Sequence, residues 1–350
     1  MGDPGSLASD PVVVVGAGLT GGLISLALAR LGLGVIQVAP ASPKTVASAS
    51  GLSYGSLSLG TSGRPWRSLE RLHGPLGWTA CGIKLHDRGW LGRRLTLAGS
   101  RVDGPTLMAA LPKALAAAGV QQRPALVQGL EAGPAGGWRL HLGAPPLGAP
   151  PLGVSILEAR QVVLSAGAGC LGLWPPLARQ LGVSWAGVLA LEINPRSNPW
   201  LRQVARGRLL LNQKEQRLGL EDQASCLAQD RWIVDASAAP WGPKGVLVGQ
   251  ISLVQPLEAP RRAPDPHRME ERLRQGLQEW DPQMASLGGT YRQVPVAFGL
   301  QGRALVGPVP GAPGLWTFTG FRSPFSTAPR RAAQVAASLA ATLTNQEPQP

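Results

Sequence analysis

The sequence predicts an α/β protein with two domains, one built on a parallel sheet and one mainly on an antiparallel sheet. Near its start, four consecutive valines (Val12–Val15) lead into a glycine turn and an apolar helical segment, and GVIQVA (34–39) then returns as a strand. After about Trp174, segments such as RWIVDAS and GVLVGQISL have the pattern of antiparallel strands. A length of 350 residues suits two domains of ordinary size.

The turn after the valines matches the pattern GxGxxG. In a Rossmann-type βαβ unit, the first glycine permits the tight turn, the second lets the backbone approach a pyrophosphate, and the third brings helix and strand together. Because a strand precedes this turn and a helix follows it, the motif predicts a dinucleotide site. The expected contacts are Gly16, Ala17, Gly18, Leu19, Thr20 and Gly21.

The strand that follows departs from the dinucleotide pattern at its end. An Asp or Glu about 20 residues after the glycines usually accepts hydrogen bonds from a ribose hydroxyl. Here the position is Ala39, whose methyl group cannot accept them. We therefore expect a dinucleotide held less tightly than usual, or held through Ser42, Lys44 or water.

The remaining elements follow in order along the chain. Small residues at 41–60 allow a ligand to approach the backbone closely. Further on, the pattern predicts an alanine-rich helix at 100–120, strands at 125–130 and 138–142, a Pro/Gly-rich loop at 143–153 and a buried strand at 159–168. It then predicts an amphipathic helix at 264–280, a strand entering a glycine turn at 314–320 and a long final helix at 323–343.

The same pattern divides the chain between the two domains. The dinucleotide-binding domain is expected to be discontinuous and to comprise residues 1–75, 95–175 and 300–345. The antiparallel-sheet domain, which would bind the substrate, is expected to comprise residues 76–94 and 176–299.

The amino-acid composition indicates which classes of protein and which kinds of site are not expected. With 44% hydrophobic and 15% charged residues, the chain is globular rather than disordered. Its net charge of +13 comes mainly from arginines that are scattered singly or in pairs, whereas nucleic-acid binders more often concentrate charge in a patch. Cys81, Cys170 and Cys226 form no CxxC pair, which favours a reducing compartment. The four histidines lack metal-ligand spacing, so no metal site is expected.

The N-terminus lacks the pattern of a signal peptide. The apolar run from Val12 to Leu28 approaches the length of a membrane span, but its spaced glycines fit a buried strand and helix better. We expect no membrane span and a cytoplasmic protein.

Five blocks in this order resemble the D-amino-acid oxidase-like flavoproteins, which include glycine oxidase and sarcosine oxidase. They are VVVVGAGLTGGLISLALARLGLGVIQVA, ASASGLSYG, SRVDGPTLMAAL, ARQVVLSAGAG and PGLWTFTGFRSPFSTAP. The resemblance implies an FAD cofactor whose pyrophosphate lies at the glycine turn. It also implies that flavin or adenine contacts come from Ser48, Ser50, Gly51, Val127, Ala166, Gly167, Gly320, Phe321, Arg322 and Ser323.

The resemblance also suggests how a substrate would react. Family members hold an amino-acid carboxylate with an arginine, because its fork suits bidentate pairing. Arg292 is the best-placed candidate, Arg303 competes with it, and Tyr54 would point a hydroxyl into the site. Arg322 would stabilise negative charge on reduced flavin. The implied reaction is oxidation of an amine or amino acid by hydride transfer to flavin N5, with oxygen or another acceptor reoxidising the flavin.

Two other functions stay open from the sequence. One is a flavin-dependent oxidoreductase that modifies tRNA, which the basic charge favours weakly and which salt-sensitive RNA binding would support. The other is a non-catalytic flavin-fold protein, which the missing acid at Ala39 and the altered arginine region after Arg292 suggest. A colourless protein that gains no thermal stability from added FAD would favour this last function.

Overall fold

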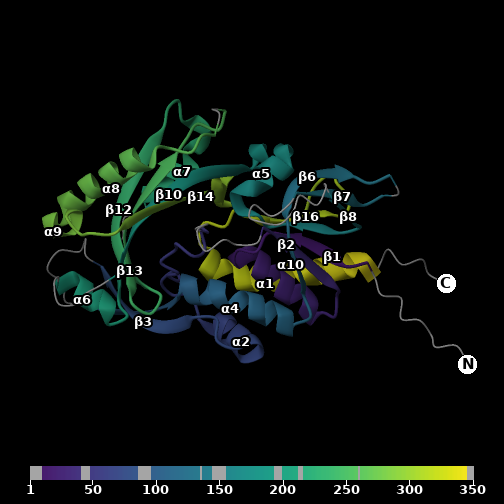
Figure 1. Cartoon of the computed structure of the whole chain (residues 1–350), viewed down its shortest axis with the longest axis horizontal. Coiled ribbons are helices and arrows are strands. Elements are labelled where there is room, and N and C mark those ends of the chain that lie inside the picture. Colours follow the sequence, from purple (N-terminus) through teal and green to yellow (C-terminus); the bar gives the residue numbers. More distant parts are fainter. Residues whose placement is uncertain are drawn as a thin grey trace, which may run out of the picture.

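The computed structural model describes residues 10–40, 48–85, 96–134, 136–143, 155–192, 199–211, 216–258 and 261–344. Two large sheets lie side by side, each with its own helices (Figure 1). The sheet at the right of this view begins with the valine strand, and the sheet at the left carries the long helix α8 (Pro266–Trp280).

The valine strand forms the centre of a mostly parallel sheet, as predicted. Within the described residues, this six-stranded sheet has the order β15 (Leu305–Pro308), β16 (Leu315–Thr319), β9 (Val162–Leu164), β1 (Val12–Val15), β2 (Val35–Ala39), β5 (Gln121–Pro124). Only the edge strand β15 is antiparallel to its neighbour. Both neighbours of β1 run parallel to it, which confirms the predicted βαβ unit.

Alternate valines of β1 face two different cores. Val12 and Val14 pack among the helices α1 (Leu19–Arg30), α2 (Arg64–His73), α4 (Gly104–Ala117) and α10 (Pro324–Thr344). Val13 and Val15 pack toward a small antiparallel sheet of β6 (Leu126–Ala132), β7 (Trp138–Gly143) and β8 (Ser155–Ala159). Since side chains alternate along a strand, a continuous valine run is the sequence expected for a strand covered on both faces.

The second large sheet is mainly antiparallel, as predicted. Its order is β14 (Thr290–Gly299), β10 (Leu181–Glu192), β13 (Gly245–Val254), β12 (Arg231–Trp241), β11 (Leu209–Leu211), β3 (Trp78–Leu85), β4 (Leu97–Val102), with only β11 and β3 parallel. The boundary expected between residues 94 and 95 falls between β3 and β4, which pair antiparallel in this sheet, and the division into domains stays a prediction.

Short helices complete the chain between these strands. They are η2 (Gly167–Gly169), α5 (Cys170–Leu173), η3 (Pro175–Arg179), α6 (Pro199–Ala205), α7 (Gln216–Asp222), η4 (Ala224–Cys226), α9 (Pro282–Ala285) and η5 (Leu300–Gly302). No helix in the described ranges combines the length and apolarity needed to cross a bilayer.

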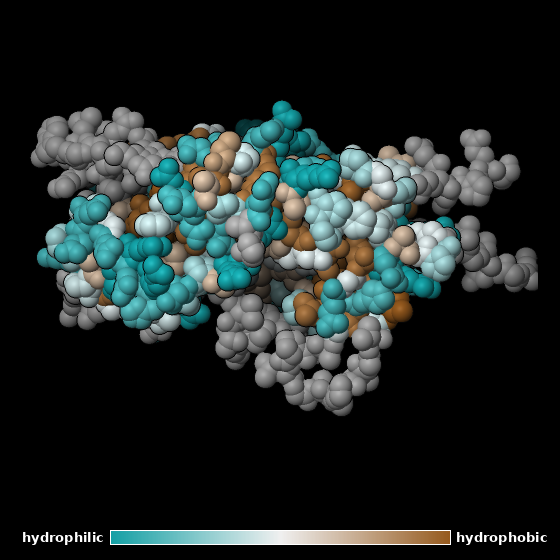
Figure 2. Space-filling model, turned by 90° about the horizontal axis from the view of Figure 1, so that it is seen from above, coloured by the Kyte–Doolittle hydropathy of each residue, from teal (hydrophilic) through white to brown (hydrophobic). Residues whose placement is uncertain are grey.

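The two faces of the antiparallel sheet have different neighbours. On one face, Leu273 and Leu277 of α8 pack in a core with strand residues such as Leu253. On the other face, Val188 and Val294 pack against residues 49–54, which follow β2 in the sequence. Seen from above, hydrophilic residues cover the end of the molecule that carries α8, and hydrophobic residues gather toward the middle (Figure 2). A cavity lined by residues of both parts of the chain lies between the two sheets.

Candidate active site

Backbone contacts within the protein determine which positions of the turn must be glycine. Gly16 has φ +118°, and a Cβ there would lie 2.5 Å from the carbonyl oxygen of Ser165. A Cβ on Gly21 would lie 2.0 Å from the carbonyl oxygen of Gly16. By contrast, a Cβ on Gly18 would meet only the Ser50 hydroxyl, at 3.4 Å. Gly16 and Gly21 therefore shape the turn, whereas Gly18 leaves its surface open beside the helix.

The first turn of α1 faces a serine from the segment after β2. The backbone N–H of Leu19 donates to Ser50 Oγ at 3.1 Å, and Gly18 provides no side-chain cap. The hydroxyl of Thr20 lies 2.9 Å from Ser165 Oγ, which donates to the carbonyl of Phe318. This network joins α1 to β16 and to the end of β9. Ala17 is exposed on the turn.

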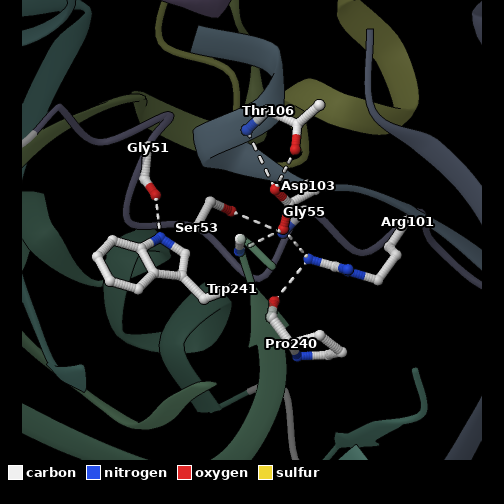
Figure 3. Close-up of polar contacts among 9 residues, drawn as sticks. Gly51, Ser53, Gly55, Arg101, Asp103, Thr106, Pro240 and Trp241 are labelled. Carbon is white, nitrogen blue, oxygen red and sulfur yellow. Dashed lines mark hydrogen bonds and ion pairs between the residues drawn. The ribbon is translucent and has the colours of Figure 1, made fainter. Parts of the chain in front are cut away.

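Ser48 and Gly51 form a compact turn in the segment Ser48–Ser53. Ser48 Oγ accepts the backbone N–H of Gly51 at 3.0 Å, and the Ser48 carbonyl accepts that of Leu52 at 3.0 Å. From the other domain, Trp241 Nε1 donates to the Gly51 carbonyl at 2.7 Å (Figure 3). The segment is thus fixed both internally and by the antiparallel sheet.

Asp103 connects the same region to the β12–β13 hairpin (Figure 3). Its Oδ1 accepts from Arg101 Nη2 at 2.7 Å and from the Gly242 N–H at 2.9 Å. Its Oδ2 accepts from the backbone N–H and the hydroxyl of Thr106, at 3.1 and 2.6 Å, and so caps α4. Burial alone would raise the pKa of Asp103, but the hydrogen bonds from Thr106, Gly242 and Arg101 outweigh it, and the net pKa lies below its ordinary value.

The C-terminal turn lies against the beginning of the antiparallel sheet. Gly320 has φ +75°, and a Cβ there would lie 2.8 Å from Leu181 Cδ1. The Gly320 carbonyl accepts the Gly299 N–H at 2.8 Å. The ring of Phe321 packs edge-on to Phe318, with 4.9 Å between centroids. After the turn, the carbonyl of Ser323 accepts the N–H groups of Ser326 and Thr327 in the first turn of α10.

The side chain of Arg322 is 11% exposed and is paired with acids. Its Nη1 lies 2.7 Å from Asp222 Oδ1, and its Nε lies 3.3 Å from Glu221 Oε2. Glu221 is fully buried, and burial raises its pKa although Arg217 and Arg322 act in the opposite direction. Arg322 Nη2 is buried without a hydrogen-bond partner in the described part of the chain. Arg322 is therefore not an ordinary surface arginine.

These segments enclose a cavity of about 190 Å³ between the two sheets. Seven of the predicted site residues line it: Leu19, Thr20, Ser50, Gly167, Gly320, Phe321 and Arg322. Ala186, Val188, Val294 and Val296 form an apolar wall on the antiparallel sheet, and Arg217 and Gln250 add polar groups. Pockets that enclose drug-sized ligands usually measure roughly 300–1,000 Å³. At their present spacing, the walls therefore enclose only a small group.

Other predicted residues lie outside the wall of this cavity. Val127 is buried in the core with Val38, near the end of β2, where the Ala39 carbonyl accepts the Ala125 N–H. Ala166 packs beside Gly16. Arg303 is exposed in the connection to β15. Residues 41–47, including the proposed ribose contacts at 42 and 44, lie outside the described residues.

Tyr54, Trp241 and Arg292 lie close to the cavity. The Tyr54 hydroxyl donates to the Ser237 carbonyl at 3.4 Å, and burial, together with the charge of Asp235, raises the pKa of Tyr54 well above its ordinary value. The Arg292 guanidinium lies 5.8 Å from the centre of the Trp241 ring. Arg292 Nε is buried without a hydrogen-bond partner among the described residues.

Sequence reasoning missed three polar residues of the site, namely Arg217, Glu221 and Gln250. The only local signal was the i, i+4 spacing of Arg217 and Glu221 in QRLGLED, which is common on solvated helices. Gln250 stands in an ordinary strand pattern. Only the packing of α7 against the C-terminal turn brings Arg217 to the cavity and Glu221 beside Arg322, and only the assembly of the antiparallel sheet brings Gln250 there.

The sheet orders and the position of the cavity define a two-domain fold that solved structures of two oxidases and a dehydrogenase share. Iminodiacetate oxidase (IdaA) from Chelativorans sp. BNC1 is similar over 97% of both chains, with a TM-score of 0.62 and 16% identity. Glycine oxidase from Geobacillus kaustophilus is similar over 95% of both chains, with a TM-score of 0.64 and 17% identity. Glycerol-3-phosphate dehydrogenase from Bacillus halodurans, complexed with FAD, covers 98% of this chain and 66% of its own, with a TM-score of 0.63 and 14% identity.

No protein-family model and no curated protein matches the sequence. The similarity to solved structures confirms the fold that the sequence predicted, a Rossmann-type domain combined with a mainly antiparallel domain.

Proposed function

We propose that this chain is an FAD-dependent oxidoreductase that oxidises a small amine or amino acid. One observation carries the proposal. A single cavity is lined at once by the N-terminus of α1, by residues 49–53, by the C-terminal turn and by the apolar wall of the antiparallel sheet. Three segments that the resemblance assigns to a flavin therefore meet the sheet of the expected substrate domain, although they are far apart in the sequence.

The residues present fit FAD at two of its three parts. At the pyrophosphate, Gly18 leaves an open surface beside the N-terminus of α1, where backbone N–H groups and the helix dipole favour an anion. At the flavin ring, Ser50, Gly167 and Gly320 offer small side chains on the cavity wall. At the ribose, Ala39 offers only a methyl group.

Bound FAD would supply a hydride acceptor at N5 of its ring, which is chemistry that the protein side chains lack. The chain itself would orient the substrate and exclude water from it. Leu52, Val188 and Val294 are buried in one apolar cluster beside the cavity, and such a wall keeps water from a reacting carbon. Arg322 would place positive charge near the ring. Oxygen or another acceptor would complete the turnover.

A non-catalytic flavin-fold protein is the second candidate. Two observations favour it, namely the methyl group of Ala39 and the small volume of the cavity, about 190 Å³. Under this proposal the fold would be retained to bind FAD or a partner without oxidising a substrate.

Absorption spectroscopy of the purified protein tests both candidates. An oxidoreductase should show flavin peaks, alone or after FAD is added, and these peaks should bleach anaerobically with at least one member of a panel of amines and amino acids. A flavin spectrum that no panel member bleaches would favour the non-catalytic candidate. A protein that stays colourless and gains no thermal stability from added FAD would exclude a flavin oxidoreductase and favour a non-catalytic protein that binds a partner instead.

A further inference from the structure

Three helices of the parallel-sheet part of the chain leave an open groove on their outer surface. The helices α1, α2 and α10 lie on one face of the parallel sheet (Figure 1), and between them is a groove of about 690 Å³. None of the residues that line the cavity between the two sheets lines this groove. The groove is therefore separate from the candidate active site.

The groove exposes apolar side chains at helical spacing. Each of the three helices contributes two apolar residues that are three or four positions apart, namely Ala27 and Leu31 at the end of α1, Leu69 and Leu72 of α2, and Ala333 and Ala337 of α10. Leu31 and Leu72 are 49% and 52% exposed. A surface helix normally turns its apolar stripe toward the core, and a contiguous exposed apolar patch marks an interaction surface. The groove can therefore receive an apolar ridge from another molecule.

Buried contacts hold the walls of the groove in place. Trp66 of α2 is 1% exposed, and its Nε1 donates to the carbonyl of Phe325 in α10 at 2.7 Å. The two rings stack with 6.2 Å between their centroids. Leu23 of α1 and Leu339 of α10 are buried in the same core. Because these helices are already fixed, binding would not require them to be ordered first.

The charged side chains of the groove carry positive charge. Among the described residues that line it, those with ionisable side chains are Arg30, His73 and Arg330. The three helices contain one acid, Glu70, whose Oε1 accepts two backbone N–H groups of the segment after α2, at 2.8 and 2.9 Å. Burial, and then the charge of Arg30, lower the pKa of His73. An acidic partner would therefore meet complementary charge at this surface.

The walls of the groove favour a helix over an extended peptide. An extended peptide gains affinity from main-chain hydrogen bonds to the edge of a sheet. Here the walls are helices, whose backbone groups are bonded internally and offer no such edge. A helix brings its own backbone hydrogen bonds and inserts apolar residues at i, i+3 or i+4, and i+7.

Two other occupants fit the groove less well. A twofold contact with a second copy of this chain would place the same surface on both sides of the interface, so the arginines of the two grooves would face one another. A flat lipid surface is bound best by an apolar face that can be pressed into it, whereas these apolar residues line a hollow. A separate protein with an acidic helix avoids both difficulties.

We propose that the groove between α1, α2 and α10 binds an amphipathic helix of a partner protein, whose apolar ridge lies in the groove and whose acidic side chains face Arg30 and Arg330. Leu31 and Leu72 would contact the ridge. The small side chain of Ala333 would let the partner helix approach α10 closely. The inference does not depend on the proposed oxidoreductase function, because it uses no residue of the cavity between the sheets.

Fluorescence anisotropy with three synthetic peptides tests the inference. Each labelled peptide is about 15 residues long, roughly four helical turns, and is held helical by a covalent staple on its outer face. The first has leucines at i, i+3, i+4 and i+7, flanked by glutamates. The second has lysines in place of the glutamates, and the third has serines in place of the leucines. The full chain, as purified, is titrated into each peptide.

Leu72→Ser tests the apolar part of the groove. Ile156→Ser is its matched control, because Ile156 is 50% exposed and Leu72 is 52% exposed, but Ile156 lies on β8. We expect the wild type to bind the first peptide more tightly than the other two. Leu72→Ser should weaken that binding roughly 3- to 10-fold, the effect of burying about half of a leucine side chain, and Ile156→Ser should leave it unchanged.

Arg30→Glu/Arg330→Glu tests the charged part of the groove. Its control is Arg261→Glu/Arg262→Glu, which changes the net charge equally at two exposed residues before α8. The groove variant should weaken binding of the first peptide roughly 10-fold or more at low salt and should prefer the lysine peptide, since like charges that face each other across an interface are unfavourable. The control should keep the preference for the first peptide.

Thermal unfolding checks that each variant folds, and Leu31→Ser, at a second exposed leucine of the groove, replaces Leu72→Ser if that variant does not. Equal binding of the first and third peptides would overturn the inference, because net charge alone would then explain the attraction. Binding that both leucine variants retain, or no binding of any peptide, would also overturn it. Self-association in sedimentation velocity, or cosedimentation with phosphatidylserine vesicles, that Leu72→Ser abolishes would overturn it in favour of a second copy or a lipid surface.

Discussion

Asp103 is expected to hold the two domains together, and Asp103→Ala should lower the free energy of unfolding by about 3–5 kcal/mol. The carboxylate accepts bonds from Arg101, from Thr106 at the start of α4 and from Gly242 in the β12–β13 hairpin. Asp103 and Arg101 are 7% and 6% exposed, so neither group can exchange its partner for bulk water.

The magnitude follows from two contributions that overlap. Loss of a helix N-cap costs about 1 kcal/mol. Leaving one member of a buried ion pair without its partner costs about 3–5 kcal/mol. Arg101 Nη2 keeps its bond to the Pro240 carbonyl at 2.6 Å, so the two costs do not simply add. Asp103→Asn keeps one oxygen that can cap α4 but replaces the other with an amide NH2, which cannot accept from Arg101 and Gly242. It should cost about 1–3 kcal/mol, less than the alanine variant, which loses both acceptors.

Urea unfolding, followed by circular dichroism, measures both variants against the wild type. The pH dependence of the free energy of unfolding gives a second measure of the stabilisation by Asp103. Since the pKa of Asp103 is lowered in the folded protein, its stabilisation is present above its unfolded pKa of about 3.9 and is lost as pH falls through the folded value. The difference between wild type and Asp103→Asn should therefore shrink in acid. A cost below about 1 kcal/mol for Asp103→Ala, or equal costs for both variants, would refute this reasoning.

Three further predictions concern the cofactor site. Ala39→Glu should tighten FAD binding by about 1.5–3 kcal/mol, because it restores a charged acceptor for a ribose hydroxyl; unchanged affinity in an FAD titration would show that the missing acid does not limit binding. The raised pKa of Glu221 means that the folded state binds this proton more tightly than the unfolded state, so the wild type should lose stability as pH rises above about 4.3. Glu221→Gln should not show this loss, and urea midpoints of the two proteins that fall in parallel as pH rises would contradict the prediction. Trp241→Phe should cost about 1–3 kcal/mol in unfolding and weaken FAD binding, because it leaves the Gly51 carbonyl without its 2.7 Å donor; wild-type values in both assays would exclude that role.

Local patterns in the sequence were enough to predict the parallel domain. A valine run, a glycine turn and a helix are determined by residues that are neighbours along the chain, and the structure has β1, α1 and β2 where the pattern predicts them. Gly16 and Gly21 are required because a Cβ at either position would collide with a backbone carbonyl, of Ser165 or of Gly16. The mainly antiparallel second domain was also predicted from alternation along its strands.

The tertiary structure determines which side chains meet at the cavity. Arg217 and Arg322 are 105 residues apart, and nothing in the i, i+4 pair on α7 indicates that it lies against the C-terminal turn. Arg292 has the sequence position expected for a substrate-binding arginine, yet the geometry of β14 places it beside Trp241 rather than in the cavity wall. Periodicity specifies which face of an element is buried, whereas the identity of the side chains that meet across a cavity depends on how distant elements pack.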